Sequence, residues 1–270
     1  MNKIDHNNLP KLLPEIDNIA RRAGDEILKI YKTDFSVCNK EDDSPLTSAD
    51  TAAHEVICKN LSLLTPQIPI LSEESSHIDF SEREKWEQYW LVDPLDGTRE
   101  FIKKNDEFTV NIALIDAHQS VLGVVHIPVI GTSYLAAINH GSHKCDKKNK
   151  MERIFVREIN EDTITIAGSR SHGNQKQQSF ISKIKNAKML SVGSSKKFCL
   201  VAEGKADIYP RFGSTSEWDT AAGQCIVEES GGKVIDEDLN RIKYNTKSSL
   251  INPSFFVIGD MSFNWNRFII

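Results

Sequence analysis

The stretch LVDPLDGTRE, residues 91–100, places two aspartates three positions apart around a proline and a leucine. Asp-Pro and Asp-Gly are common turn dipeptides, so an ordinary loop is the simplest interpretation. The apolar run YWLV, residues 89–92, is typical of a buried strand, and it leads directly into Asp93. A second interpretation is therefore a cation site at a strand end, with Asp93 and Asp96 as ligands, beside a helix start that suits a phosphate.

The composition describes a globular protein of 270 residues, which is enough for one large domain or two modest ones. The formal net charge is −5, so the basic excess that is typical of proteins binding polymeric nucleic acid is absent. The five cysteines include no CxxC pair, which favours a reducing compartment over a disulfide framework or a zinc site. The sequence shows neither a signal-peptide pattern nor a long apolar run, so we expect no membrane-spanning helix and a cytoplasmic protein.

The first part of the chain has the pattern of an α+β unit. Apolar residues at helical spacing predict amphipathic helices over residues 10–31 and 48–64. Residues 108–140 contain β-rich runs between short turns, which predicts an antiparallel meander. The polar, basic segment 141–150 is expected to be a solvated loop. We therefore expect an α+β subdomain over residues 1–160, which carries most of the candidate metal ligands.

Beyond residue 160 the pattern changes to alternating strands and helices. Strands are predicted at 163–168, 188–193 and 206–211, with polar or amphipathic helices between them and a further helix from Glu217. Alternation of this kind is typical of α/β structure. We therefore expect an α/β subdomain over residues 161–270.

Three further acids occupy positions comparable to those of the opening stretch. Glu73 and Glu74 follow the apolar run IPIL, and Asp219 lies at the start of a predicted helix. Taken singly, such acids are most often solvated or cap a helix. Together with Asp93 and Asp96 they supply the carboxylate oxygens that Mg²⁺ prefers over Cys or His. Two ions held close together need a bridging carboxylate, and Asp93 could provide it.

Three motifs carry a resemblance to a known superfamily: EE at 73–74, DPLDGT at 93–98 and WDTAA at 218–222. They resemble, in this order and over nearly the whole chain, the signature motifs of the lithium-sensitive, magnesium-dependent phosphatases. That superfamily includes the inositol monophosphatases and the fructose-1,6-bisphosphatases. The resemblance implies a layered α/β/α/β/α sugar-phosphatase-like fold and hydrolysis of a phosphomonoester without a covalent intermediate.

The resemblance also implies which residues hold the cations. The first Mg²⁺ would be held by Glu73, Asp93 and the Leu95 carbonyl. The second would be held by Asp93, Asp96 and Asp219. Glu73 would share a third, looser ion, so the resemblance implies two or three ions. Glu74 has no ligand role in the family pattern.

The same resemblance assigns a catalytic pair and the contacts to the substrate. Asp50, in the motif PLTSAD, would act with Thr98 to orient and activate the attacking water. The metals would activate that water and stabilise the leaving oxygen. The residues expected to contact the substrate near the metals are Glu73, Asp96, Gly97, Thr98 and Asp219.

Basic and small residues after three predicted strands bear on the choice of substrate. They lie in SRSH at 169–172, GSSKKF at 193–198 and IYPR at 208–211. Their simplest interpretation is a set of surface charges and a helix cap. However, ligands of open α/β sheets collect at the carboxyl ends of strands. These stretches closely resemble the bacterial CysQ-type 3'(2'),5'-bisphosphate nucleotidases, which convert adenosine 3',5'-bisphosphate to AMP and so clear a by-product of sulfate assimilation.

This second resemblance implies a separate subsite for a remote phosphate. His172 would lie against the adenine or the ribose, and Ser194, Lys197 and Arg211 would hold the 5'-phosphate. Arginine binds phosphate in a bidentate manner, and lysine adds a point charge. Members of the inositol branch usually carry a glutamate seven residues before the last aspartate of the motif. This chain has Phe212 there, which weakens the inositol interpretation.

Two alternatives stay open at this point. One is an inositol monophosphatase or a broad-specificity sugar phosphatase, and the other is a catalytically silent nucleotide sensor that keeps the fold. We expect a small nucleotide bisphosphate as the partner and no polymeric nucleic acid. We also expect a monomer or a homodimer, either free in the cytoplasm or loosely attached to the inner face of the cytoplasmic membrane.

Overall fold

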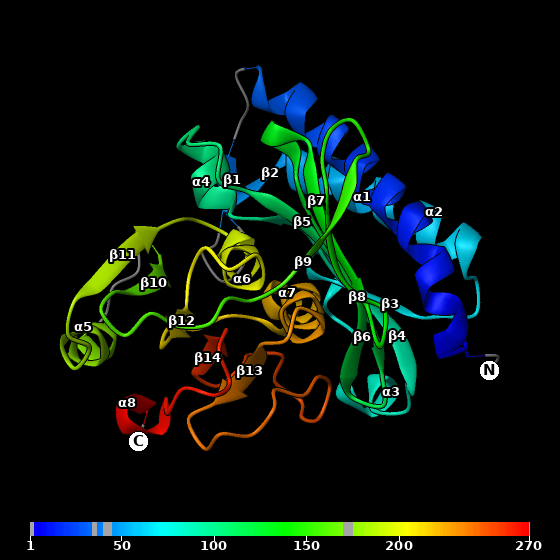
Figure 1. Ribbon diagram of the computed structural model, residues 1–270. Coiled ribbons are helices and arrows are strands. Elements are labelled where there is room, and N and C mark those ends of the chain that lie inside the picture. Colours follow the sequence, from blue (N-terminus) through cyan, green and yellow to red (C-terminus); the bar gives the residue numbers. More distant parts are fainter. Residues whose placement is uncertain (1–2, 34–36, 40–44, 170–174, 270) are drawn as a thin grey trace.

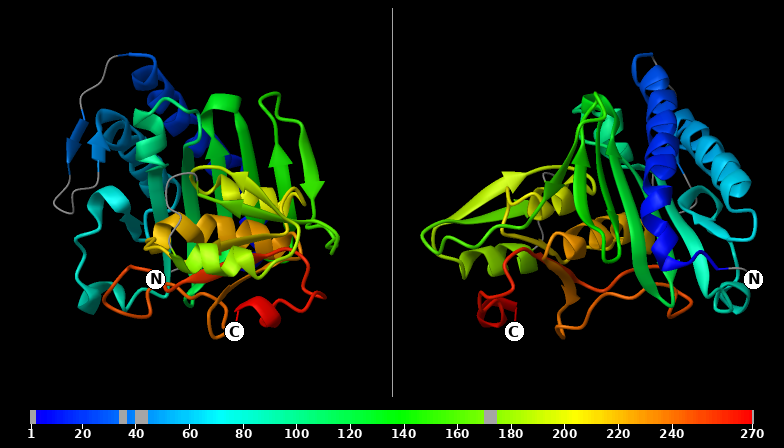
Figure 2. Two further views of the ribbon diagram at one scale, coloured as in Figure 1. Left: turned by 90° about the vertical axis from the view of Figure 1, so that its left-hand side faces the viewer. Right: turned by 45° about the vertical axis from the view of Figure 1, so that its right-hand side comes forward.

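The computed structural model describes residues 3–33, 37–39, 45–169 and 175–269. Two β-sheets are stacked, with helices between them and on both outer faces (Figures 1 and 2). The helices α1 and α2 cover one outer face, α6 and α7 lie between the sheets, and α5 and α8 lie beyond the smaller sheet (Figure 1). This arrangement confirms the predicted α/β fold with α/β/α/β/α layers.

The outer helices of the larger sheet bury an apolar stripe. These helices are α1 (Leu9–Tyr31) and α2 (Ser48–Leu64), which agree with the helices predicted from hydrophobic periodicity. Their apolar side chains join those of the adjacent sheet face in one buried cluster. The helix α2 begins with a capping box, in which Thr47 and Asp50 satisfy each other's backbone N–H groups. Short elements before and between them are η1 (His6–Asn8), β1 (Val37–Asn39) and β2 (Pro45–Thr47).

The larger sheet has seven strands in chain order. Only its first pair, β3 and β4, is parallel, and the remaining pairs are antiparallel. The predicted antiparallel meander is therefore confirmed. Its strands are β3 (Ile70–Ser72), β4 (Gln88–Asp96), β5 (Thr109–Asp116), β6 (Gln119–Ile127), β7 (Thr132–Ala137), β8 (Gly141–Cys145) and β9 (Met151–Ile154). The short helices along it are η2 (Glu73–Ser75), α3 (Phe80–Arg83), α4 (Thr98–Ile102) and η3 (Pro128–Ile130).

The expectation of a solvated loop over residues 141–150 is wrong for its first half. Residues 141–145 form β8, which pairs with both β7 and β9. Ser142 and Cys145 are buried in this strand, and the Lys144 ammonium forms a 2.7 Å ion pair with Glu203. Burial of small side chains and pairing of the charged one explain why a polar sequence is accommodated in the sheet.

The strand β4 extends further than the sequence predicted. It continues through Asp96, with a register shift against β5 between Asp93 and Asp96. Pro94 has no N–H to offer the ladder, which accounts for the irregularity at this point. Asp93 therefore lies within the strand rather than after it, and the irregular segment separates the two aspartates along β4.

The smaller sheet is mixed. Its order is β11-β10-β12-β14-β13, and β10, β11 and β12 run parallel, so their carboxyl ends share one edge. The strand β14 runs antiparallel to both of its neighbours. The strands are β10 (Ile164–Gly168), β11 (Ala187–Ser191), β12 (Ile208–Arg211), β13 (Lys233–Asp236) and β14 (Phe255–Ile258). The helices of this half are α5 (Gln175–Ser182), α6 (Lys196–Ala202), α7 (Glu217–Glu229) and α8 (Asn266–Ile269).

The helix α7 connects the two halves, because it packs on the inner face of the larger sheet although it follows β12 in the chain. One glycine permits close packing of α7 on the sheet, and another permits its close packing on α6. A Cβ at Gly123 of β6 would lie 2.4 Å from the Ala222 carbonyl oxygen, and one at Gly223 would lie 2.5 Å from the Phe198 ring.

The proposed division into two subdomains near residue 160 falls between β9 and β10 and stays a prediction. No helix among the described residues has the length and apolar character needed to cross a bilayer.

Candidate active site

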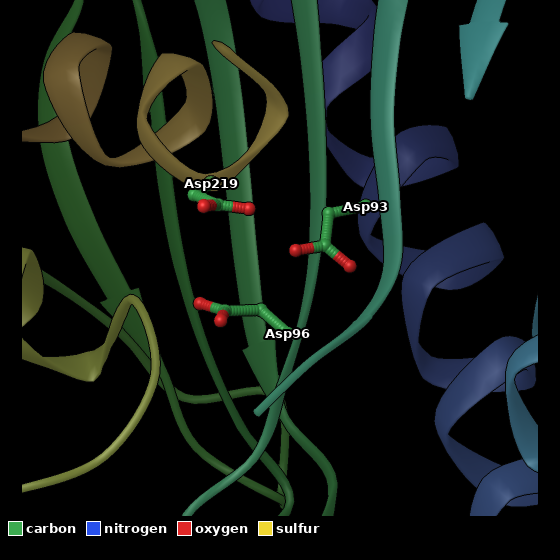
Figure 3. A group of neighbouring side chains, drawn as sticks. All are labelled: Asp93, Asp96 and Asp219. Atoms are coloured by element: carbon green, nitrogen blue, oxygen red, sulfur yellow. The ribbon is translucent and has the colours of Figure 1, made fainter. Parts of the chain in front are cut away.

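Three aspartates from distant parts of the chain converge between the two sheets. Asp93 and Asp96 come from β4, and Asp219 comes from the first turn of α7 (Figure 3). Each contributes a carboxylate oxygen, and these oxygens lie within 4.8 Å of one another. The carboxylates point toward a common space between the strand and the helix (Figure 3). Such a group of hard oxygen donors suits Mg²⁺, which prefers carboxylates.

The electrostatics of this group favour a bound cation. Asp93 is only 1% exposed, and burial raises the pKa of its carboxyl group well above the ordinary value, with further contributions from Glu73 and Asp96. Burial also raises the pKa of Asp219, and the charge of Asp96 adds to this effect. Like charges gathered in a poorly solvated place are unfavourable. A divalent cation removes that penalty, so the residues present fit magnesium.

Hydrogen bonds leave one oxygen of each carboxylate for such a cation. The backbone N–H of Leu95 donates to Oδ1 of Asp93 over 3.0 Å, and that of Ser216 donates to Oδ2 of Asp219 over 2.9 Å. All hydrogen bonds that the described residues make to Asp96 reach its Oδ2. Anchoring through one oxygen fixes the direction of the other, as is usual around protein metal sites.

Asp50 and Thr98 lie next to this group. The Thr98 hydroxyl is 3.2 Å from Oδ1 of Asp50 and 3.3 Å from the Leu95 carbonyl oxygen. The other oxygen of Asp50 accepts hydrogen bonds from the backbone N–H and the hydroxyl of Thr47, over 2.8 and 2.7 Å. Asp50 is 1% exposed, so the helix cap holds a buried carboxylate in one orientation beside the Thr98 hydroxyl.

One cavity of about 610 Å³ contains most of the candidate site. It brings the acidic group together with the strand ends of the smaller sheet. The residues predicted from sequence that line it are Glu73, Asp93, Leu95, Asp96, Gly97, Thr98, Ser194, Lys197, Arg211 and Asp219. Asp50 contacts the cavity wall through Thr98. His172, which was predicted to contact the nucleoside, lies outside the described residues.

The basic wall of the cavity includes a buried lysine. Lys197 is 6% exposed, and its ammonium donates to the carbonyl oxygens of Ser194, over 2.5 Å, and Val192, over 3.3 Å. Burial lowers the pKa of Lys197 to about 8, although the charge of Asp96 acts in the opposite direction. These two backbone carbonyls take two of its three N–H donors and leave its charge unneutralised. The ammonium therefore remains available to an anion in the cavity.

Arg211 forms the other cationic part of this wall. Its Nε donates to the Gly213 carbonyl oxygen over 3.2 Å, and its Nη2 donates to that of Ser214 over 2.9 Å. The guanidinium is thus held by the turn that follows β12 and keeps its charge. Arginine in this setting is suited to bidentate binding of phosphate.

Phe212 points into a different part of the molecule. Its ring packs against those of Phe180 and Phe256, with centroid distances of 5.9 and 5.5 Å. These rings belong to the apolar cluster of the smaller sheet and its outer helices. At the position where inositol phosphatases usually carry a glutamate, this chain therefore has an apolar side chain that stabilises its core.

Two residues that sequence reasoning did not select, Asn111 and Ser195, also contact the site. Asn111 of β5 donates to the Ser195 hydroxyl over 2.7 Å, and Ser195 donates to Asp96. Asn111 is a polar residue between apolar neighbours in the β-rich run FTVNIALID, and this placement could have marked it as a candidate site residue. The sequence marks Ser195 less clearly as a candidate site residue, because small polar residues are common where a helix begins.

Comparison with known proteins identifies the family. The sequence pattern of the Inositol monophosphatase family matches residues 11–257. The chain belongs to this family. A relative of the same family, the 3'(2'),5'-bisphosphate nucleotidase CysQ of Salmonella typhimurium, is 45% identical over 91% of this chain and 99% of its own length.

Solved structures from the family agree with this assignment. The crystal structure of CysQ from Bacteroides thetaiotaomicron, a bacterial member of the inositol monophosphatase family, has a TM-score of 0.78 and 41% identity, and the match covers 89% of this chain and 94% of that one. An IMPase of Thermotoga maritima has a TM-score of 0.74 at 23% identity, with 91% of each chain covered, and shares the fold. The predicted resemblance to CysQ-type members of the family is confirmed by these relatives.

Proposed function

We propose that this protein is a magnesium-dependent phosphatase that removes the 3'-phosphate of adenosine 3',5'-bisphosphate, giving AMP and phosphate. The observation that carries the proposal is the single cavity with two unlike walls. One wall holds clustered carboxylates, and the other holds Lys197 and Arg211. A substrate with two phosphate groups could place one at the carboxylate wall and the other at the basic wall. The curated relatives named 3'(2'),5'-bisphosphate nucleotidase CysQ support the same activity.

Magnesium would be held by Asp93, Asp96 and Asp219, with Glu73 and the Leu95 carbonyl oxygen completing the two or three ion sites. All five line the cavity. When bound, the ions supply positive charge to the attacking and leaving oxygens of the phosphate ester. The number of ions follows from the family resemblance and is part of the proposal.

Asp50 and Thr98 would direct the attacking water. The Thr98 hydroxyl is already oriented by its contacts with Asp50 and Leu95, so its lone pairs can accept a hydrogen bond from a water in the cavity. The buried Asp50 carboxylate is the base closest to that hydroxyl and would receive the proton through it. The capping contacts from Thr47 keep the carboxylate in place during this transfer.

The basic wall would hold the phosphate that does not react. Lys197 and Arg211, together with Ser194, would grip the 5'-phosphate, and His172 would contact the nucleoside. Binding energy from this remote group positions the 3'-phosphate against the acidic wall. Phe212 is apolar, so this position lacks the carboxylate with which an inositol phosphatase would hydrogen-bond the inositol ring of its substrate. Physiologically, the reaction would clear a by-product of sulfate assimilation, and we propose that it takes place in the cytoplasm.

The proposal is tested by measuring phosphate release from adenosine 3',5'-bisphosphate and from inositol 1-phosphate, with Mg²⁺ and with EDTA. We expect kcat/KM to be much higher for the nucleotide and activity to disappear in EDTA. A higher kcat/KM for inositol 1-phosphate would overturn the substrate assignment. Absence of phosphate release from every phosphomonoester would indicate a nucleotide sensor without catalytic activity.

A further inference from the structure

The Asp96 carboxylate is held by an unusual concentration of donors on one oxygen. Oδ2 accepts from the backbone N–H of Ser195 over 2.5 Å and also from the Ser195 hydroxyl. Thr109 and Asn111 approach the same oxygen at 3.5 Å. Ser195 and Asn111 are 2% and 1% exposed, so the donors lie behind the half-buried Asp96 carboxylate, on the side away from bulk water.

The Ser195 hydroxyl contacts two of the three clustered acids. Besides Asp96, its Oγ lies 3.1 Å from the backbone carbonyl oxygen of Asp219. It also accepts a hydrogen bond from Asn111 Nδ2. A hydroxyl has one proton, and the ionised carboxylate is the stronger acceptor, so the proton points to Asp96 while Asn111 fixes the oxygen. Ser195 therefore connects β4, β5 and α7 at the cation site.

The same residue belongs to the turn that forms the basic wall. Ser195 lies between Ser194 and Lys197, in the segment that joins β11 to α6. This segment is tightly held, because Ser194 has a left-handed φ of 50° and the Gly193 N–H donates to Glu107 over 2.9 Å. An anion that stabilises this turn would also hold Asp96 in place, because Ser195 joins the two through two hydrogen bonds.

We propose that Ser195 is a positioning residue that aims Asp96 at the cation and couples cation affinity to occupancy of the basic wall. The positioning part rests on the acidic group alone. The coupling part rests on the proposed function, in which the basic wall holds a 5'-phosphate. With Oδ2 fixed by Ser195, Oδ1 is the Asp96 oxygen left for a cation. Contacts of this kind behind a metal ligand typically change metal affinity by about 10- to 100-fold.

The positioning part is tested by binding Mn²⁺ alone to the full chain, followed by calorimetry and by the EPR signal of the free ion. We expect Ser195→Ala to weaken Mn²⁺ binding by about 10-fold or more, and Ser195→Thr, which keeps the hydroxyl, to restore most of the loss. The matched control is Ser120→Ala. Ser120 is a buried serine that bonds the Ala221 carbonyl oxygen of α7 over 2.7 Å without contacting Asp96, and its loss should leave Mn²⁺ affinity unchanged.

Equal Mn²⁺ affinity in wild type and Ser195→Ala, or an equal loss in Ser120→Ala, would overturn the positioning role. Circular dichroism verifies that each variant is folded. If Ser195→Ala does not fold, Asn111→Ala serves in its place, because it removes the 2.7 Å donor that fixes the Ser195 oxygen, together with a longer 3.5 Å contact to Asp96. A loss of about 3-fold in Mn²⁺ affinity is expected for it, and no loss would contradict the proposal.

The coupling part is tested by repeating the titration with saturating AMP, which carries the 5'-phosphate. Because coupling between two sites is reciprocal, AMP should tighten Mn²⁺ binding in the wild type and Mn²⁺ should tighten AMP binding by the same factor. We expect a factor of about 5 that shrinks toward 1 in Ser195→Ala. An equal factor in both proteins would overturn the coupling.

The failure of the proposed function would look different. If AMP did not bind, or bound Lys197→Met as tightly as wild type, the assignment of the basic wall to the 5'-phosphate would fail and the coupling part would fail with it. The Mn²⁺ titration without nucleotide would still decide the positioning role of Ser195, because that measurement involves no substrate.

Discussion

The acidic and basic walls of the cavity differ in how far they are organised before any ligand binds. On the acidic wall, the buried Asp93 carboxylate and the half-buried ones of Asp96 and Asp219 lie close together, and the pKa values of Asp93 and Asp219 are raised. On the basic wall, the cationic groups of Lys197 and Arg211 already hydrogen-bond to backbone carbonyls. The acidic wall is therefore suited to a cation that would offset its charge, whereas the cationic groups of the basic wall are held in position by the chain itself.

This difference separates two tasks that one active site has to perform. In the proposed function the acidic wall carries the chemistry, and a bound cation would stabilise the like charges gathered there. In the same proposal the basic wall selects the substrate, and its cationic groups, already held by backbone carbonyls, would lose less conformational freedom when an anion binds. Changes on the acidic wall should consequently affect every substrate, and changes on the basic wall should affect only substrates that reach it.

The largest effect is expected for Asp93→Asn. Asp93 is proposed to bridge the first two ions, so its loss should weaken cation binding at both of those sites. We expect kcat to fall by at least about 100-fold on all substrates, the usual scale for losing a major electrostatic stabiliser. Steady-state phosphate release at saturating Mg²⁺ measures this loss. The control is Asp25→Asn, at an exposed acid of α1, which should leave kcat unchanged. Near-normal turnover by a folded Asp93→Asn protein would refute the metal assignment.

A smaller and selective effect is expected for Arg211→Ala. One charge-assisted contact is worth roughly 1.5–3 kcal/mol, which corresponds to about 10- to 150-fold in kcat/KM. We expect that loss for adenosine 3',5'-bisphosphate and little change for 3'-AMP, which lacks the 5'-phosphate. Arg22→Ala, at an exposed arginine of α1, is the control. An equal loss on both substrates would mean that Arg211 supports the site generally and that the walls are not independent.

The pH dependence of AMP binding sharpens the comparison further. Burial lowers the pKa of Lys197 to about 8, so its charge is present below that pH and is lost as the pH rises through it. We expect AMP to bind about 10-fold more weakly at pH 9 than at pH 7. Calorimetric titrations at several pH values measure this change. The Lys197→Met variant should bind AMP weakly at every pH. If AMP binding by this variant kept the pH dependence of the wild type, that dependence would belong to another group.

The smallest effect concerns the stability of the metal-free protein. Carboxyl groups with raised pKa values keep protons in the folded state that the unfolded chain has released, so the free energy of unfolding should fall as pH rises above about 4. Removing one such acid in Asp93→Asn should raise the Tm in EDTA at pH 8 by about 3 °C and reduce the stabilisation by added Mg²⁺. Thermal melts in EDTA and in Mg²⁺ measure both. A lower Tm than wild type in EDTA would contradict this view of the acidic wall.

The acidic wall could be predicted from sequence more completely than the contacts that support it. The residues Asp93, Asp96 and Asp219 lie in short motifs, and strong apolar periodicity marked the helices α1 and α2. The contact between Asn111 and Ser195 joins residues 84 positions apart, which no local pattern encodes. The strand β8 escaped prediction for a related reason, since its charged residue is satisfied by Glu203 from the other half of the chain.

The position of α7 between the sheets also has a consequence for synthesis of the chain on the ribosome. The strands β3 to β9 are complete at Ile154, but the helix that covers their inner face ends only at Glu229. Until that helix emerges, the nascent chain presents apolar residues such as Leu91 and Val125 without the cover provided by Ala221 and its neighbours. Translation that stops before Glu217 would therefore yield a polypeptide with a bare sheet and an incomplete cation site, a natural substrate for chaperones and proteases.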